Sequence, residues 1–82
     1  MATRDKRIEA MRRNPRSVRF EELRAVLEGL GFSSRPGKGD HWRFHHPSRP
    51  NFLTIDARRP VLLVGYVKEA LKEIDAVLSE EE

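Results

Sequence analysis

Two amphipathic helical stripes, separated by a segment rich in glycine and proline, constrain this fold more than any other feature. In the first, apolar residues step by three, four and three positions, as on a helix with one buried face: Phe20, Leu23, Leu27 and Leu30. In the second, over residues 64–79, they step by four, three and four: Val67, Leu71, Ile74 and Leu78. Gly31 ends the first helix, because glycine adopts a left-handed conformation at low cost. Both helices have to bury an apolar face, so the segment between them must form a surface that they can cover.

The intervening segment predicts three short strands, at residues 32–36, 41–46 and 52–56. Two glycines in the turn at 37–40 favour a hairpin between the first two strands. The order helix, strand, strand, strand, helix predicts an α+β fold in which both helices cover one face of a three-stranded antiparallel sheet. The other face is left to solvent or to a partner. The predicted core consists of Phe20, Leu23, Leu27, Phe44, Ile55, Val67, Leu71 and Ile74.

The N-terminal residues predict an additional short helix at 4–13. Only Ile8 and Met11 offer it an apolar side, and Asn14-Pro15 stops it. We therefore expect a loosely docked basic arm over residues 1–16, either extended along a nucleic acid or disordered. The main domain is predicted over 17–79 and an acidic tail over 80–82.

Length and composition limit the classes of site. Eighty-two residues make one small domain, so an active site must lie on its outside or in a shallow groove. Without cysteine there is no disulfide and no thiolate metal site. No apolar run reaches the length of a membrane span, and the first ten residues lack the apolar centre of a signal peptide. We expect a cytoplasmic protein.

Positive charge is concentrated in two parts of the chain. The formal net charge is +3, but residues 1–20 carry seven cations against two carboxylates, and residues 32–59 carry six against two. Twelve of the sixteen cations are arginine, which binds phosphate in a bidentate manner and stacks on bases. This favours a nucleic-acid partner, although a high arginine content also keeps a small protein soluble.

The predicted second strand, HWRFHH, contains all three histidines. Side chains alternate along a strand, so Trp42 and Phe44 are expected in the core and His41, Arg43 and His45 on the open face. His41 and His45 are about 13 Å apart along a strand. Ligands of one zinc ion lie about 2.0 Å from it, so we expect no metal site. A strand histidine is more often a surface or packing residue than a catalyst, and the residues alone leave both interpretations open.

Four segments together resemble the HicA family of bacterial toxins from type II toxin–antitoxin systems. They are VRFEELRAVLEGLGF, GKGDHWRFHHP, FLTI and GYVKEALKEI, within about residues 17–78. The resemblance implies a fold like that of a double-stranded-RNA-binding domain. It also implies cleavage of messenger RNA without a metal or cofactor, through the histidine of a Gly-x-His motif, and inhibition by a HicB-type antitoxin that covers this histidine. Gly39-Asp40-His41 matches the motif, which makes His41 the implied catalytic residue.

The chain departs from the family pattern at two places. Position 40 is Asp, where relatives often have Ser or another small residue, so a carboxylate is adjacent to the implied catalytic residue. After the third strand many relatives have a Pro and a His, whereas this chain has DARR at residues 56–59.

RNA provides its own nucleophile, the 2′-hydroxyl, so an enzyme need only move protons and neutralise the phosphate. Free imidazole titrates near pH 6.5, which suits His41 to act as general base or general acid. Its second acid–base partner is not identified by the residues. Arg43, about 7 Å along the strand, is expected to hold the scissile phosphate. The other expected RNA-binding residues are Arg35, Lys38, Gly39 and His45.

Two other functions remain open at the level of sequence. A non-catalytic RNA-binding module needs arginine and lysine but no general base. A protein-interaction domain would use the open face or an edge strand to pair with another chain.

Overall fold

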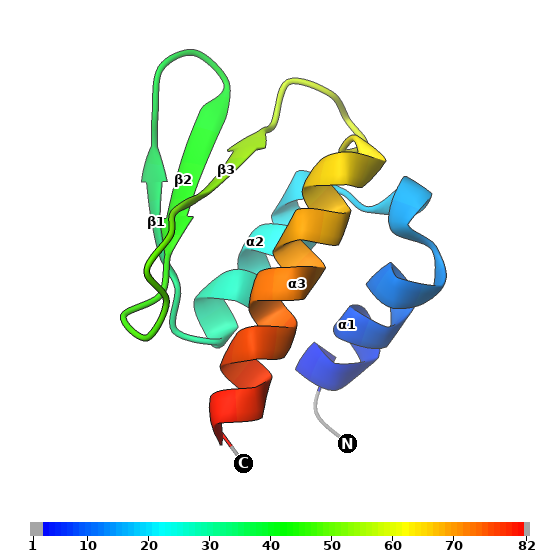
Figure 1. Ribbon diagram of the computed structural model, residues 1–82. Helices are drawn as coiled ribbons and strands as arrows, with labels where there is room; N and C mark the ends of the chain where they lie inside the picture. The colour runs from blue at the N-terminus through cyan, green and yellow to red at the C-terminus, as the bar shows by residue number, and fades with distance from the viewer. Residues whose placement is uncertain (1–2, 82) are drawn as a thin grey trace.

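The computed structural model describes residues 3–81 and contains one sheet with helices on one of its faces (Figure 1). In chain order the elements are α1 (Thr3–Arg13), the 3₁₀ helix η1 (Pro15–Ser17), α2 (Phe20–Gly29), β1 (Ser33–Pro36), β2 (His41–His45), β3 (Leu53–Asp56) and α3 (Val64–Glu81). The predicted α+β order of helix, three strands and helix is confirmed. The ends of the elements differ from the predicted ends by no more than two residues.

The glycine that ends α2 adopts the left-handed conformation that the sequence predicts. Gly31 has φ of +100°. Its N–H donates to the Glu28 carbonyl at 3.1 Å, and the N–H of Phe32 donates to the Leu27 carbonyl at 3.0 Å. These two bonds satisfy carbonyl groups that the end of a helix would otherwise leave without a partner. The chain therefore reverses directly from α2 into β1.

The sheet has the strand order β1-β2-β3, and both pairs are antiparallel. Its inner face carries Phe44, Leu53 and Ile55, whose exposed fractions are 0%, 3% and 0%. α2 and α3 lie against this face, whereas no helix covers the outer face over the described residues (Figure 1). The outer face is the open face that the sequence predicts.

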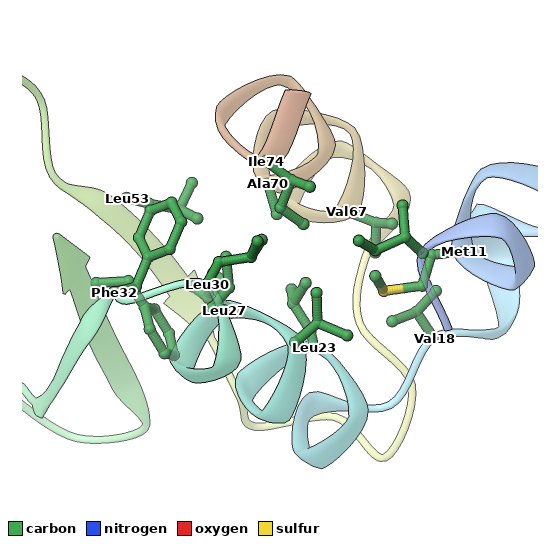
Figure 2. Close-up of a cluster of buried hydrophobic side chains, with 14 of the residues drawn as sticks. Met11, Val18, Leu23, Leu27, Leu30, Phe32, Leu53, Val67, Ala70 and Ile74 are labelled. Carbon is green, nitrogen blue, oxygen red and sulfur yellow. The ribbon is translucent and has the colours of Figure 1, made fainter. Parts of the chain in front are cut away.

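The core forms where α2, α3 and the inner face of the sheet meet (Figure 2). Most of the predicted core residues are fully buried: Leu23, Leu27, Phe44, Ile55, Val67 and Ile74. Phe20 and Leu71 are only half-buried and pack against the edge of this cluster, so their prediction as buried residues is wrong. Phe20 is the first residue of α2, and Leu71 lies beside the buried positions of α3 rather than among them.

Trp42 also lies at the edge of the core. Its ring faces the helices, with the Phe20 ring centroid 5.4 Å away and the guanidinium carbon of Arg24 4.4 Å from the indole centroid. The tryptophan therefore points inward, as expected, but it is half-buried rather than fully buried.

The N-terminal helix is part of the core, so the expectation of a loosely docked arm is wrong. Ile8 and Met11 of α1 have exposed fractions of 4% and 3%. Figure 2 shows Met11 on the α1 side of the buried cluster, next to Val18. The Arg12 guanidinium also binds Asp75 of α3, with Nη1 3.0 Å from Oδ2, and this hydrogen bond raises the pKa of Arg12. Two apolar side chains are enough here because both join the buried cluster, where α1 packs against α2, η1 and α3.

Candidate active site on the open face of the sheet

The turn between β1 and β2 fixes the position of His41. Gly39 in this turn has φ of +65°, in the left-handed region that favours glycine. The Gly37 N–H donates to the His41 carbonyl at 2.7 Å, and the His41 N–H donates to the Lys38 carbonyl at 3.3 Å. A Cβ atom at Gly37 would lie 3.2 Å from the His41 carbonyl oxygen, so the turn backbone runs directly against this residue. The short, glycine-containing turn thus holds the backbone of His41 on both sides.

The two ring nitrogens of His41 have different surroundings. Nδ1 lies 3.3 Å from the Lys38 carbonyl oxygen. Because a carbonyl oxygen can only accept a hydrogen bond, this contact assigns the proton of the neutral ring to Nδ1 and the lone pair to Nε2. Within residues 3–81, Nε2 has no hydrogen-bond partner. His41 therefore presents an unengaged basic nitrogen.

Most of the predicted site residues meet on the open face. Arg35 on β1 is the direct cross-strand partner of Arg43 on β2, so both side chains project from the same face. Lys38 and Gly39 lie in the exposed turn beside His41 rather than in the centre of the face. Those that project from the strands onto the face are Arg35, His41, Arg43 and His45.

A shallow pocket of about 250 Å³ lies on the same face, at the opposite end of the strands from the turn. Its lining residues are Ser33, Arg35, Arg43, His45 and Phe52. The ring centroids of His45 and Phe52 are 4.7 Å apart with an interplanar angle of 34°. The guanidinium carbon of Arg43 lies 5.8 Å from the Phe52 centroid. The pocket thus combines an aromatic floor with two arginines, and no carboxylate lines it.

His45 is held in place through the loop between β2 and β3. Its Nε2 lies 3.0 Å from the Arg49 carbonyl oxygen, so this nitrogen carries a proton and donates. The Arg49 side chain in turn donates from Nε to Oε1 of Glu73 on α3 at 2.9 Å, and this hydrogen bond raises the pKa of Arg49. The ring of His45 is therefore a fixed wall of the pocket, and its Nε2 is not available as a base.

Two carboxylates flank His41, and one arginine lies between them. Asp56 on β3 is the cross-strand partner of His41. Arg58 places Nε 3.7 Å from Oδ2 of Asp40 and Nη2 3.9 Å from Oδ2 of Asp56. Its backbone N–H also donates to Oδ1 of Asp56 at 2.9 Å. Where the resemblance implies a second histidine, this chain has an arginine whose charge offsets part of the negative charge beside His41.

The third histidine is structural. His46 Nε2 lies 3.1 Å from the Leu30 carbonyl oxygen, and Nδ1 accepts from the Ser48 N–H at 3.1 Å. Its ring also packs edge-on against Phe32, with centroids 5.1 Å apart. Nε2 of His46 therefore joins the end of β2 to the end of α2, and Nδ1 is occupied by Ser48 in the loop that follows β2.

Neither a metal-binding cluster nor a membrane helix is present in the part of the chain that the structure describes. Residues 3–81 contain no group of three or more His, Cys, Asp or Glu side chains arranged to hold a metal ion. None of the helices in this range combines the length and the apolar character needed to cross a bilayer.

The family model for the HicA toxin of bacterial toxin–antitoxin systems matches residues 20–76. This range is well over half of the chain, from the start of α2 almost to the end of α3. The chain belongs to the HicA toxin family. No curated protein matches it, and neither does any solved structure. As a HicA protein it is the toxin of a toxin–antitoxin system, in a family of ribonucleases, and the family implies an RNA substrate and an antitoxin partner.

The HicA match includes the whole open face and excludes α1. Within that face, sequence reasoning did not assign a role to Phe52 or Arg58. The signal for Phe52 was present, because an aromatic residue on the solvent side of a predicted strand is unusual in a chain with so few aromatics. Arg58 had no such signal, since its contacts with Asp40 and Asp56 depend on how two separate loops meet.

Proposed function

We propose that this HicA protein is an endoribonuclease that cleaves messenger RNA without a metal ion and uses His41 as its general base. One observation carries the proposal. Of the three histidines on or beside β2, only His41 has an Nε2 without a hydrogen-bond partner within residues 3–81, while its Nδ1 lies against a carbonyl oxygen. A neutral imidazole in this tautomer accepts a proton at Nε2.

The reaction uses the nucleophile that RNA already contains. His41 Nε2 removes the proton of a ribose 2′-hydroxyl, and the 2′-oxygen attacks the adjacent phosphorus. The bond between phosphorus and the 5′-oxygen of the next nucleotide breaks, and this oxygen takes a proton from solvent on the open face. The imidazolium then returns its proton to water. The products are a 2′,3′-cyclic phosphate and a 5′-hydroxyl, and DNA is not cut because it has no 2′-hydroxyl.

The cations near His41 hold the phosphate backbone. Arg43 lies two residues along the same strand face, about 7 Å from His41 in the strand direction, and binds the scissile phosphate. Arg35 is its direct cross-strand partner. Like charges directly opposite one another destabilise a sheet, so this arginine pair fits a surface that receives an anion. Lys38 and the exposed backbone at Gly39 contact the phosphates that flank the cut.

The same face is the docking surface for the antitoxin. No helix of residues 3–81 covers it, and a HicB-type antitoxin that binds there blocks access of RNA to His41. We propose the cytoplasm as the compartment of this activity, because messenger RNA is the proposed substrate.

The proposal is tested with purified protein and synthetic RNA in buffer that contains EDTA. We expect the wild-type chain to cleave RNA, and a matched strand that contains only deoxyribose to stay intact. His41→Ala should lower the cleavage rate by about 100-fold or more, the size of a general base contribution. Its RNA affinity should stay close to that of the wild type. Induced expression should stop growth of the host with the wild-type chain and not with His41→Ala.

Three outcomes contradict the proposal. Products with a 3′-hydroxyl and a 5′-phosphate would show that water, not the 2′-oxygen, is the nucleophile. Loss of cleavage in EDTA that added Mg²⁺ restores would show that the chemistry needs a metal. Tight RNA binding without cleavage by either protein would favour a non-catalytic RNA-binding module of the same fold.

A further inference from the structure

The most exposed large apolar side chain of the described residues lies inside the arginine-lined pocket of the open face. Phe52 has an exposed fraction of 62%, against 48% for Leu63, the other exposed large apolar residue. Single exposed apolar residues are common on protein surfaces and need no explanation by themselves. Phe52 differs because its neighbours are arranged around it.

The ring of Phe52 contacts His45 and Arg43 and is still largely exposed. The His45 ring lies 4.7 Å from it between centroids, tilted by 34°, and is itself held by its hydrogen bond to the Arg49 carbonyl. The two aromatic rings therefore form a platform beside the end of β2, with His45 in that strand and Phe52 one residue before β3. A flat apolar group that enters the pocket would stack on this platform with little loss of conformational freedom in the protein.

The charges around Phe52 define the chemistry of that group. Arg35 and Arg43 line the pocket, and within residues 3–81 neither of them forms an ion pair. Two unpaired guanidinium groups beside an exposed aromatic ring suit a ligand that has both a phosphate and a planar base. A carboxylate-rich or purely apolar partner fits this pocket less well.

We propose that the pocket of Ser33, Arg35, Arg43, His45 and Phe52 binds an unpaired RNA base, stacked on Phe52, at a nucleotide next to the one that His41 attacks. This inference rests on the proposed function and adds the class of substrate. Within the pocket, His45 and the adjacent Phe52 ring lie four strand residues from His41, about 13 Å, so the base on this ring belongs to a flanking nucleotide and not to the cleaved one. Bases in an A-form duplex are paired and stacked on each other and cannot lie on a protein ring. The toxin therefore selects RNA that is single-stranded beside the cut.

The test measures binding separately from cleavage by using His41→Ala as the background. The probes are a short fluorescein-labelled single-stranded oligoribonucleotide, the same sequence closed into a hairpin duplex, and a single strand that carries 2-aminopurine. We expect tighter binding of the single strand than of the duplex. Phe52→Ala should weaken single-strand binding by about tenfold, the usual effect of losing one stacked base. It should also abolish the quenching of 2-aminopurine, which reports stacking directly.

Two further variants control for indirect effects. Phe52→Trp keeps a stacking ring and should keep both affinity and quenching. Leu63→Ala removes the other exposed apolar side chain, outside the pocket, and should change neither. The inference is overturned if Phe52→Ala binds the single strand as tightly as its parent, or if the duplex is bound as well as the single strand.

The result can be separated from that of the cleavage assay. If His41 is needed for cleavage but Phe52→Ala does not change binding, the base pocket is refuted and the proposed function stands. If a base stacks on Phe52 but the protein never cleaves RNA, the proposed cleavage reaction is refuted and the base pocket stands.

Discussion

Met11→Ala tests whether the N-terminal helix is part of the folded core. Met11 is 3% exposed, and Ile8, one helical turn earlier, is 4% exposed. Replacement of a buried methionine by alanine usually costs 2–5 kcal/mol, and α1 lies at the edge of the core, so we expect about 2 kcal/mol. The total stability of a chain of 82 residues is about 4–12 kcal/mol. A single change in α1 should therefore remove a substantial part of the free energy of unfolding.

The assay is urea unfolding of the purified protein, followed by circular dichroism. Met11→Ala should lower the unfolding midpoint without changing the slope, because α1 unfolds together with the rest of the domain. Lys6→Ala, on the exposed side of the same helix, is the matched control and should change stability by less than about 0.5 kcal/mol. If Met11→Ala behaves like Lys6→Ala, or if α1 melts in a separate transition, the helix is an appended arm and the reasoning is refuted.

Two further changes test the C-terminal end of α2. Gly31→Ala forces a side chain into a φ of +100° and places its Cβ about 3.3 Å from Nε2 of His46, so it should cost about 1–2 kcal/mol in urea unfolding. Gly29→Ala, whose Cβ would meet nothing within 4 Å, is its control, and equal losses in the two variants would argue against the left-handed cap. The second of these changes is Glu28→Gln. Hydrogen bonds, first from Ser34 and then from an arginine of the same helix, lower the pKa of Glu28 below its usual 4.5. A lowered pKa in the folded state adds stability above pH 4.5 that disappears as the pH falls through the folded value, so wild type and Glu28→Gln should converge in thermal stability in acid. A gap between their melting curves that does not narrow below pH 4.5 would contradict this assignment.

The main architecture could be predicted because its signals are local. Each helical stripe lies within a single segment. Gly31 predicts the end of α2 because glycine adopts the left-handed conformation at low cost. Alternation along β2 then separates Phe44 from Arg43 without knowledge of any partner strand. Properties of this kind depend on residues a few positions apart, so the sequence carries them directly.

Features that depend on two distant segments could not be predicted in the same way. α1 has only two apolar residues on its inner side, which is a weak stripe by itself. What makes it stable is its packing against α2, η1 and α3, and no periodicity in α1 reports these neighbours. Arg58 reaches Asp40 for a similar reason, since the β2–β3 register brings the end of β3 beside the turn.

The three histidines cannot be assigned different roles from residue type alone, and their hydrogen-bond contacts distinguish them. His41, His45 and His46 lie within six positions and have the same intrinsic chemistry. Their roles differ because of the atom that each Nε2 meets. A backbone carbonyl lies 3.0 Å from Nε2 of His45 and 3.1 Å from Nε2 of His46, so both nitrogens donate and hold the fold together. In His41 the carbonyl meets Nδ1 instead, which leaves the lone pair on Nε2 available to a substrate. Because the backbone sets the tautomer of the His41 ring, no second side chain is needed for this purpose. This is consistent with a site on the surface of a domain that is too small to enclose an active site.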